Sequence, residues 1–96
     1  MPEILTLAQL STELQSLPGW TGDEKQIEKN FQKKDFKAAL MFVNQVGDLA
    51  EAADHHPDIL LHGWNKIRIT LSTHSAGGVT KNDINLARQI EEIAPA

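Results

Sequence analysis

The chain has 96 residues, a length that suits one domain over residues 1–96 and leaves no room for two. Its net charge is −4 with only nine Lys and Arg residues, which argues against a basic face for binding nucleic acid. It contains no Cys, so disulfides, Cys-ligated zinc sites and cysteine nucleophiles are excluded.

A helix and a hairpin are predicted for the first part of the chain. Apolar residues at helical spacing predict a helix over residues 5–17, with Thr6 as its N-cap. A Pro-Gly pair ends this helix, and we expect a hairpin between Trp20–Thr21 and Gln26–Gln32. Trp20 is expected to be a core or cleft-wall aromatic, with stacking on a ligand as the lesser alternative.

A second helix is predicted over Phe36–Ala53, with Asp35 as its N-cap. Pro57 bars the helix from continuing, so His55 and His56 are expected at its C-terminal exit. Its apolar positions fall at helical spacing and comprise Phe36, Ala39, Leu40, Val43, Val46, Gly47 and Ala50. The glycine in this set is expected where the helix approaches the sheet closely.

Two strands joined by a tight turn are predicted next. Ile59–Leu61 is a short apolar strand, His62-Gly63 fits a two-residue hairpin loop, and Trp64–Thr73 has the best strand pattern in the chain. One alternating set is expected to face the helices and comprises Asn65, Ile67, Ile69, Leu71 and Thr73. The other set is polar, and we expect it to face solvent or a partner subunit.

The chain ends in a turn over Ser75–Gly78 and a last helix that begins with a capping box formed by Thr80 and Asp83. The residues expected on the buried side of this helix are Ile84, Leu86, Ala87, Ile90 and Ile93. The element order is therefore α-β-β-α-β-β-α. It predicts an α+β fold in which three helices pack on one face of an antiparallel four-stranded sheet.

No segment has the pattern of a signal peptide or the roughly 18 consecutive apolar residues of a membrane span, so we expect a soluble, cytoplasmic protein. A domain of this size buries about 60–70% of the surface that its unfolded chain exposes. We therefore expect a ligand site in a surface cleft or near a subunit boundary.

Three of the four histidines lie where core packing does not explain them. His55 and His56 follow a helix, and His74 ends the long strand, so all three are expected at one edge of the sheet. Imidazoles titrate at about pH 6.5, which suits general acid and base catalysis near neutrality. His62 is instead assigned to its turn, where the backbone conformation explains it.

Metal binding and anion binding are the competing uses of these residues. Adjacent histidines in extended geometry point apart, and their spacing to His74 matches no standard zinc site. An anion could bind at the start of the last helix, but Asp83 competes for that place. Metal binding therefore stays a lesser alternative.

A longer pattern joins these histidines to the residues around them. It comprises Glu51, Asp54-His55-His56-Pro57, Asn65-Lys66, the run Ile69–His74, then Gly77-Gly78 and Asp83. This pattern closely resembles the pterin-4a-carbinolamine dehydratase family. The start of the chain agrees, with a helix ending in Gly19-Trp20. The segment from Pro57 to Asn65 is one residue longer than in the animal members, and Ile59 replaces their aromatic residue.

The resemblance implies a hydro-lyase that dehydrates 4a-hydroxytetrahydrobiopterin to the quinonoid dihydropterin and so serves tetrahydrobiopterin recycling. It implies no metal and no redox cofactor, a homodimer or homotetramer, and a functional link to an aromatic amino acid hydroxylase. Animal members also act as dimerisation cofactors for a homeodomain transcription factor. The alternative is a pterin-binding or protein-interaction module of the same fold without dehydratase activity.

The resemblance also implies roles for individual residues. His55 and His74 are expected to form the acid–base pair, with His56 binding and orienting the pterin, and the direction of each proton transfer is left open. The residues expected to bind or support the pterin are Glu51, Asp54, Ser72, Thr73, Ser75 and Asp83, with Trp20 added as an aromatic wall.

Overall fold

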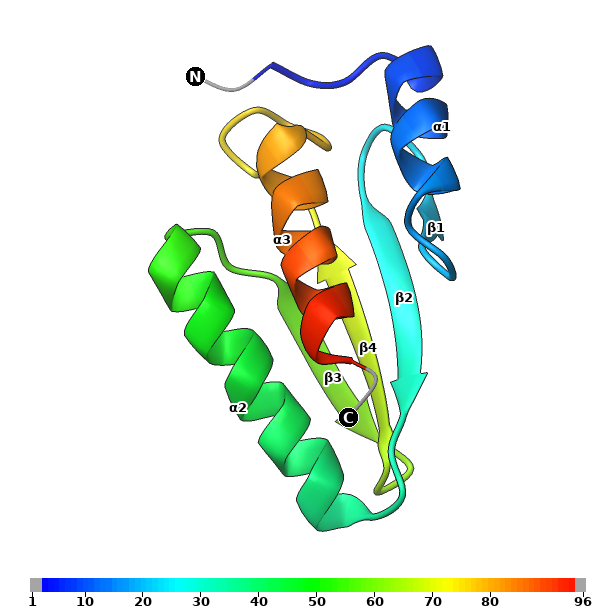
Figure 1. Cartoon of the computed structure of the whole chain (residues 1–96). Helices are drawn as coiled ribbons and strands as arrows, with labels where there is room; N and C mark the ends of the chain where they lie inside the picture. Colours follow the sequence, from blue (N-terminus) through cyan, green and yellow to red (C-terminus); the bar gives the residue numbers. More distant parts are fainter. Residues whose placement is uncertain (1–2, 95–96) are drawn as a thin grey trace.

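The computed structural model describes residues 3–94, and the predicted domain over residues 1–96 extends past them at both ends (Figure 1). The elements are α1 (Leu7–Gln15), β1 (Thr21–Gly22), β2 (Ile27–Gln32), α2 (Phe36–Ala53), β3 (Asp58–His62), β4 (Lys66–Leu71) and α3 (Lys81–Ile93). This order confirms the predicted α+β fold. No helix among the described residues is both long and apolar enough to span a membrane.

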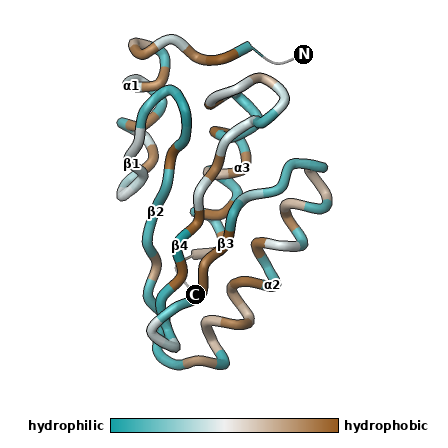
Figure 2. The backbone as a smooth tube through the Cα atoms, turned by 180° about the vertical axis from the view of Figure 1, so that it is seen from behind, coloured by the Kyte–Doolittle hydropathy of each residue, from teal (hydrophilic) through white to brown (hydrophobic). Residues whose placement is uncertain are grey.

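The four strands form one antiparallel sheet in the order β1-β2-β4-β3. The register of the central pair runs from Ile27 opposite Leu71 to Gln32 opposite Lys66. Apolar and polar residues alternate along β4 and so determine which face of the sheet the helices cover. The apolar residues of β4 are fully buried, while Lys66 and Arg68 are exposed. Figure 2 shows apolar segments along β3, β4 and α2, whereas β2 is more hydrophilic.

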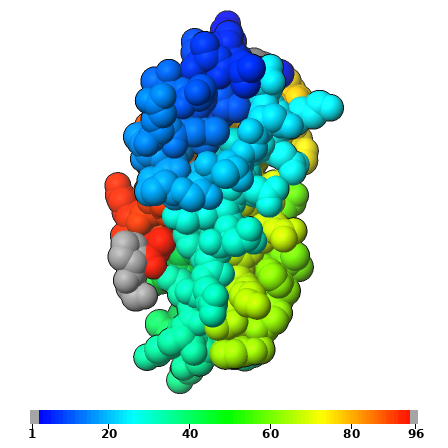
Figure 3. Space-filling model, turned by 90° about the vertical axis from the view of Figure 1, so that its right-hand side faces the viewer, coloured from blue at the N-terminus to red at the C-terminus, as the bar shows by residue number. Residues whose placement is uncertain are grey.

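The three helices lie on the same side of the sheet, as predicted. Figure 3 shows α1 against the β1–β2 hairpin at one end of the molecule. Glu13 of α1 joins this end to α3 by ion pairs to Lys81 and to Arg88, the latter at 3.0 Å. The hydrogen bond from Lys81, together with the charges of Lys81 and Arg88, lowers the pKa of Glu13.

Aromatic side chains fill the core between the helices and the sheet. Trp20 packs edge-on against Phe31 at a centroid distance of 6.2 Å, and Phe31 lies 4.9 Å from Phe42. Phe42 is a core residue of α2 that the sequence prediction left out. Trp20 is 3% exposed, so it takes the core position that was its first predicted place.

Three helical expectations are wrong in detail. The first helix begins after its predicted cap Thr6 but ends at Gln15, short of residue 17, and Leu7 of its predicted apolar face is exposed. In α2 the buried residues are Ala39, Phe42, Val46 and Ala50. This face is rotated from the predicted one, and Phe36 and Leu40 are left exposed. A Cβ atom at Gly47 would meet nothing within 4 Å, so this glycine does not mark a close approach to the sheet.

The second hairpin also differs from its prediction. His62 belongs to β3 and pairs with Lys66, so the loop is residues 63–65 and not His62-Gly63. Gly63 and Trp64 both have positive φ, at 55° and 61°. The cause lies in Asn65, whose side-chain amide and main-chain carbonyl both bond to the backbone of Lys33. These bonds turn Asn65 inward and leave Trp64 outside the strand, 62% exposed.

Candidate active site

The C-terminal end of α2 turns one of two adjacent histidines inward. Asp54 adopts the left-handed conformation at φ 50°, and the amide of His55 donates to the carbonyl of Ala50 at 3.1 Å. This reversal sends the chain back toward the sheet. The His55 side chain is consequently 12% exposed, whereas that of His56 is 59% exposed.

The carboxylate of Asp83 receives the inward histidine at the start of α3. Its Oδ1 lies 2.5 Å from Nε2 of His55. Its Oδ2 accepts from the Thr73 hydroxyl and from the Thr80 amide, each at 2.8 Å. Asp83 is fully buried and closes the predicted capping box, so one carboxylate both begins the helix and holds the imidazole.

The loop between β4 and α3 brings Thr73 to this carboxylate. The amide of Thr73 donates to the carbonyl of Gly78 at 3.0 Å, which closes the loop as an isolated bridge. Gly77 has φ 82°, and a Cβ atom on Gly78 would lie 2.5 Å from the carbonyl oxygen of Glu24. Two glycines are therefore required where the loop turns and where the β1–β2 connection packs against it.

His55 and Thr73 are two predicted site residues that both hydrogen-bond to a third, the buried carboxylate of Asp83. His74 follows Thr73 in the chain and stands exposed on the same turn, with Ser75 beside it. This end of the molecule therefore carries two of the predicted imidazoles.

Among residues 3–94, the other predicted residues lie outside this hydrogen-bonded group. His56 pairs through Nε2 with Glu51, one helical turn back, and both side chains are exposed. Asp54 is exposed at the helix exit, and Ser72 donates its hydroxyl to the carbonyl of Lys25 at 2.7 Å. Trp20 lies in the core and makes no hydrogen bond to this group among the described residues.

Sequence reasoning missed the part that Thr80 plays. Its amide donates to Asp83, and its hydroxyl lies 2.7 Å from that of Thr73. The signal was present as the capping box, which was interpreted only as a helix start. That the boxed carboxylate also holds His55, 28 positions away, depends on the tertiary fold.

The arrangement suits separately oriented imidazoles. Each of two adjacent histidines has its own carboxylate partner, which can orient the ring. Among residues 3–94, no group of three His, Asp or Glu side chains is placed to hold a metal ion.

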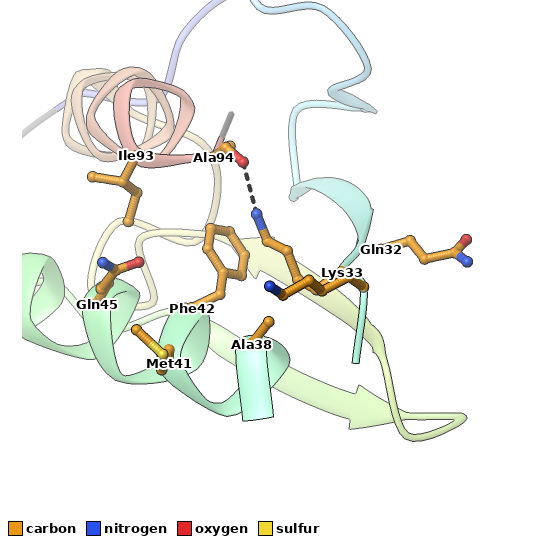
Figure 4. Close-up of a pocket in the computed structure, with 9 residues that line it drawn as sticks. Gln32, Lys33, Ala38, Met41, Phe42, Gln45, Ile93 and Ala94 are labelled. Atoms are coloured by element: carbon orange, nitrogen blue, oxygen red, sulfur yellow. Dashed lines mark hydrogen bonds between the residues drawn. The ribbon is translucent and has the colours of Figure 1, made fainter. Parts of the chain in front are cut away.

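A cavity of about 510 Å³ lies near the N-terminal half of α2 and the end of α3, and no predicted site residue lines it. Figure 4 shows Lys33 reaching over the Phe42 ring, with Nζ 2.7 Å from the carbonyl oxygen of Ala94. Burial lowers the pKa of Lys33. Its ammonium already has a partner, and the cavity adjoins the end of the described chain.

Comparison with known proteins gives a consistent match over nearly the whole chain. The family model described as pterin 4 alpha carbinolamine dehydratase matches residues 3–93. A protein of Nocardia farcinica, named provisionally as a pterin-4-alpha-carbinolamine dehydratase, is 49% identical over 92 residues, covering 96% of each chain. One from Roseiflexus castenholzii with the same provisional name is 47% identical, covering 97% of this chain and 99% of its own.

Two solved structures share the fold. A transcriptional coactivator/pterin dehydratase from Brucella melitensis is 38% identical with a TM-score of 0.88, covering 94% of this chain and 97% of its own. A pterin dehydratase-like protein, identified as a RuBisCO assembly factor in the alpha-carboxysome, is 20% identical with a TM-score of 0.64. That alignment covers 80% of this chain and 88% of the other, and it shows a shared fold alone.

Proposed function

Because the chain belongs to the pterin-4a-carbinolamine dehydratase family, we propose that it dehydrates 4a-hydroxytetrahydrobiopterin to the quinonoid dihydropterin. An aromatic amino acid hydroxylase would supply this substrate, and the product would return to the tetrahydrobiopterin pool. The family match over residues 3–93 and the identity of 49% to a similarly named protein support the proposal.

The reaction needs two proton transfers and no change of oxidation state. The C4a–O bond breaks as the hydroxyl group receives a proton and leaves as water. N5 loses its proton, and its electron pair forms the C4a=N5 double bond. One acid and one base suffice for these steps, so we propose that the reaction needs neither a metal nor a redox cofactor.

The observation that carries this proposal is the hydrogen bond between His55 and the buried carboxylate of Asp83. It orients one imidazole, and the same carboxylate binds Thr73, whose neighbour His74 supplies a second one. We assign His55 and His74 as the acid–base pair. His56, held by Glu51, is assigned to binding and orienting the pterin.

The remaining predicted residues divide by exposure. Asp54 and Ser75 are exposed and Ser72 is half-buried, so we propose that they line the pterin site together with the histidines. Thr73 and Asp83 are buried and act through His55. Trp20 is left out of the contact set because its ring is enclosed in the core.

We further propose that the protein is a homodimer or homotetramer in the cytoplasm. Large apolar side chains on its surface support association, because they lose contact with water when covered. They are Ile4, Leu7, Phe36, Leu40, Met41, Leu60 and Trp64. Light scattering coupled to size-exclusion chromatography tests this, and a monomer at micromolar concentration would refute it.

A stopped-flow assay tests the enzymatic proposal. Freshly generated 4a-carbinolamine is mixed with the unmodified protein, and its loss is followed against the spontaneous reaction. We expect acceleration by the protein and a loss of about 100-fold in kcat for His74→Ala. An unmodified rate for His74→Ala would refute its assignment. Pterin binding without acceleration by the unmodified protein would favour the interaction module instead.

A further inference from the structure

The buried hydrogen bonds around Asp83 determine which ring nitrogen of His55 is available for chemistry. We propose that Thr73 and Thr80 are positioning residues that fix hydrogen on Nε2 of His55, so that Nδ1 is the atom that exchanges a proton with the substrate. The proton exchange between Nδ1 and the substrate rests on the proposed dehydratase function. The position of the hydrogen on Nε2 is a property of the protein without substrate.

The direction of each hydrogen bond follows from the groups that can only donate. The Thr80 amide must donate, so Oδ2 of Asp83 accepts at 2.8 Å. The same oxygen lies 2.8 Å from the Thr73 hydroxyl, which gives it its single hydrogen. Oδ2 therefore accepts two hydrogen bonds and is occupied as an acceptor.

The Thr80 hydroxyl extends this series of hydrogen bonds, and its direction is also fixed. The Thr73 oxygen lies 2.7 Å from that of Thr80, and since its hydrogen points at Asp83, the Thr80 hydroxyl donates to Thr73. The Thr80 oxygen accepts in turn from the amide of Asn82 at 3.2 Å. Each hydroxyl hydrogen in this buried group thus has one donor oxygen and one acceptor.

The remaining hydrogen to assign is the one between Asp83 and His55. Oδ1 of Asp83 lies 2.5 Å from Nε2 of His55, and the carboxylate accepts at both oxygens. Nε2 therefore carries a hydrogen whether the ring is neutral or cationic. Rotating the imidazole so that Nε2 no longer faces Asp83 would remove one hydrogen-bond donor from this carboxylate. Because the carboxylate is fully buried, that loss is costly.

Nδ1 of His55 is on the open side of the ring. Among residues 3–94 it has no hydrogen-bond partner. It is also absent from the set of buried side-chain atoms without partners, which comprises Trp20 Nε1, His62 Nε2 and Glu91 Oε2. With the side chain 12% exposed, Nδ1 therefore reaches the surface, where a proton can pass to or from a bound pterin.

Nitrogen-15 NMR on the full chain without substrate tests this directly. We expect neutral His55 to carry its hydrogen on Nε2, and that hydrogen to exchange with water at least about tenfold more slowly than those of His56 and His74. Neutral His55 with its hydrogen on Nδ1, or exchange as fast as in His56, would overturn the proposal.

A matched pair of variants adds the kinetic readout. Thr73→Val keeps the shape and removes the hydroxyl, while Thr73→Ser keeps the hydroxyl. We expect Thr73→Val to speed exchange of the His55 hydrogen and lower kcat about tenfold with little change in KM, and Thr73→Ser to restore both. Equal behaviour of the two variants would overturn the role of Thr73. If Thr73→Val does not fold, the spectrum of the unmodified protein still decides.

The two proposals fail separately. An inactive protein in which neutral His55 carries hydrogen on a protected Nε2 would refute the dehydratase function and support the assignment of the ring atoms. An active protein in which neutral His55 carries hydrogen on Nδ1 would support the function and refute the assignment.

Discussion

Two adjacent histidines, each paired with a carboxylate, are held in opposite ways. His55 meets Asp83 in a site where the carboxylate has no exposed surface. His56 meets Glu51 at the surface, where the two side chains are 59% and 77% exposed. Water screens the second pair and leaves it free to rearrange, whereas the first is fixed by its neighbours. The surroundings of each pair therefore decide which imidazole is held in one orientation.

Removing the charge of Asp83 should have the largest effect. Asp83→Asn replaces an acceptor oxygen with a donor, so we expect the free energy of unfolding to fall by about 3 kcal/mol. We also expect kcat to fall about 100-fold, because His55 loses its orientation. Urea unfolding and stopped-flow kinetics measure the two effects.

Glu51→Gln is the matched control, because it makes the same kind of change in the exposed pair. It should leave stability within experimental error. An equal loss of stability in Glu51→Gln and Asp83→Asn would remove the distinction between the two pairs.

The loop that carries Thr73 offers a second way to disturb only the buried pair. In Gly78→Ala the new Cβ atom would lie 2.5 Å from the carbonyl oxygen of Glu24, so backbone must shift. We expect a loss of about 2 kcal/mol in the free energy of unfolding and lower activity. Unchanged stability by urea unfolding would show that the loop does not hold Thr73 as described.

Glu13 is a carboxylate of intermediate exposure and should show an intermediate effect. The hydrogen bond from Lys81 and the charges of Lys81 and Arg88 lower its folded-state pKa below 4.5. The contribution of Glu13 to the free energy of unfolding is therefore complete above pH 4.5. It is lost as the pH falls through the lowered pKa of the folded state.

Glu13→Gln should accordingly cost about 1 kcal/mol near neutral pH and less at about pH 3. Urea unfolding at the two pH values measures the difference. A cost that stays the same or grows on acidification would contradict the ion pairs between α1 and α3.

Apart from the Glu51→Gln control, the smallest expected change in stability is a gain. Gly47 lies inside α2, the helix that precedes His55 and His56, and a Cβ atom there would touch nothing within 4 Å. Gly47→Ala should raise the free energy of unfolding by about 0.7 kcal/mol and leave activity unchanged. A loss of stability or activity would mean that this side of α2 matters to either pair or to an assembly.

Local patterns predicted most of the fold because they depend on nearby residues. The alternation along β4, the caps Thr6 and Asp35 and the Thr80 capping box all lie where the structure has them. The buried face was assigned wrongly in α2, where apolar residues lie around much of the helix. Spacing alone does not say which of these residues pack against the sheet. The shifted hairpin at Trp64 depends on the distant bonds of Asn65 to Lys33.

The site was predictable in its residues but not in its connections. Sequence placed His55 and His56 together at a helix exit without saying which would turn inward. The left-handed conformation of Asp54 decides that, and the carboxylate that receives the ring comes from another helix. Such pairings depend on how the elements pack, which no local pattern records.

Of the two adjacent histidines, we propose that His55 in the buried pair carries one of the two proton transfers and that His56 in the exposed pair carries neither. Stopped-flow dehydration of freshly made carbinolamine by His55→Ala and His56→Ala, measured side by side, tests it most directly. We predict that His55→Ala loses about 100-fold in kcat while His56→Ala keeps most of it and raises KM. Equal losses, or a His55→Ala protein at the unmodified rate, would contradict this assignment of His55 and His56.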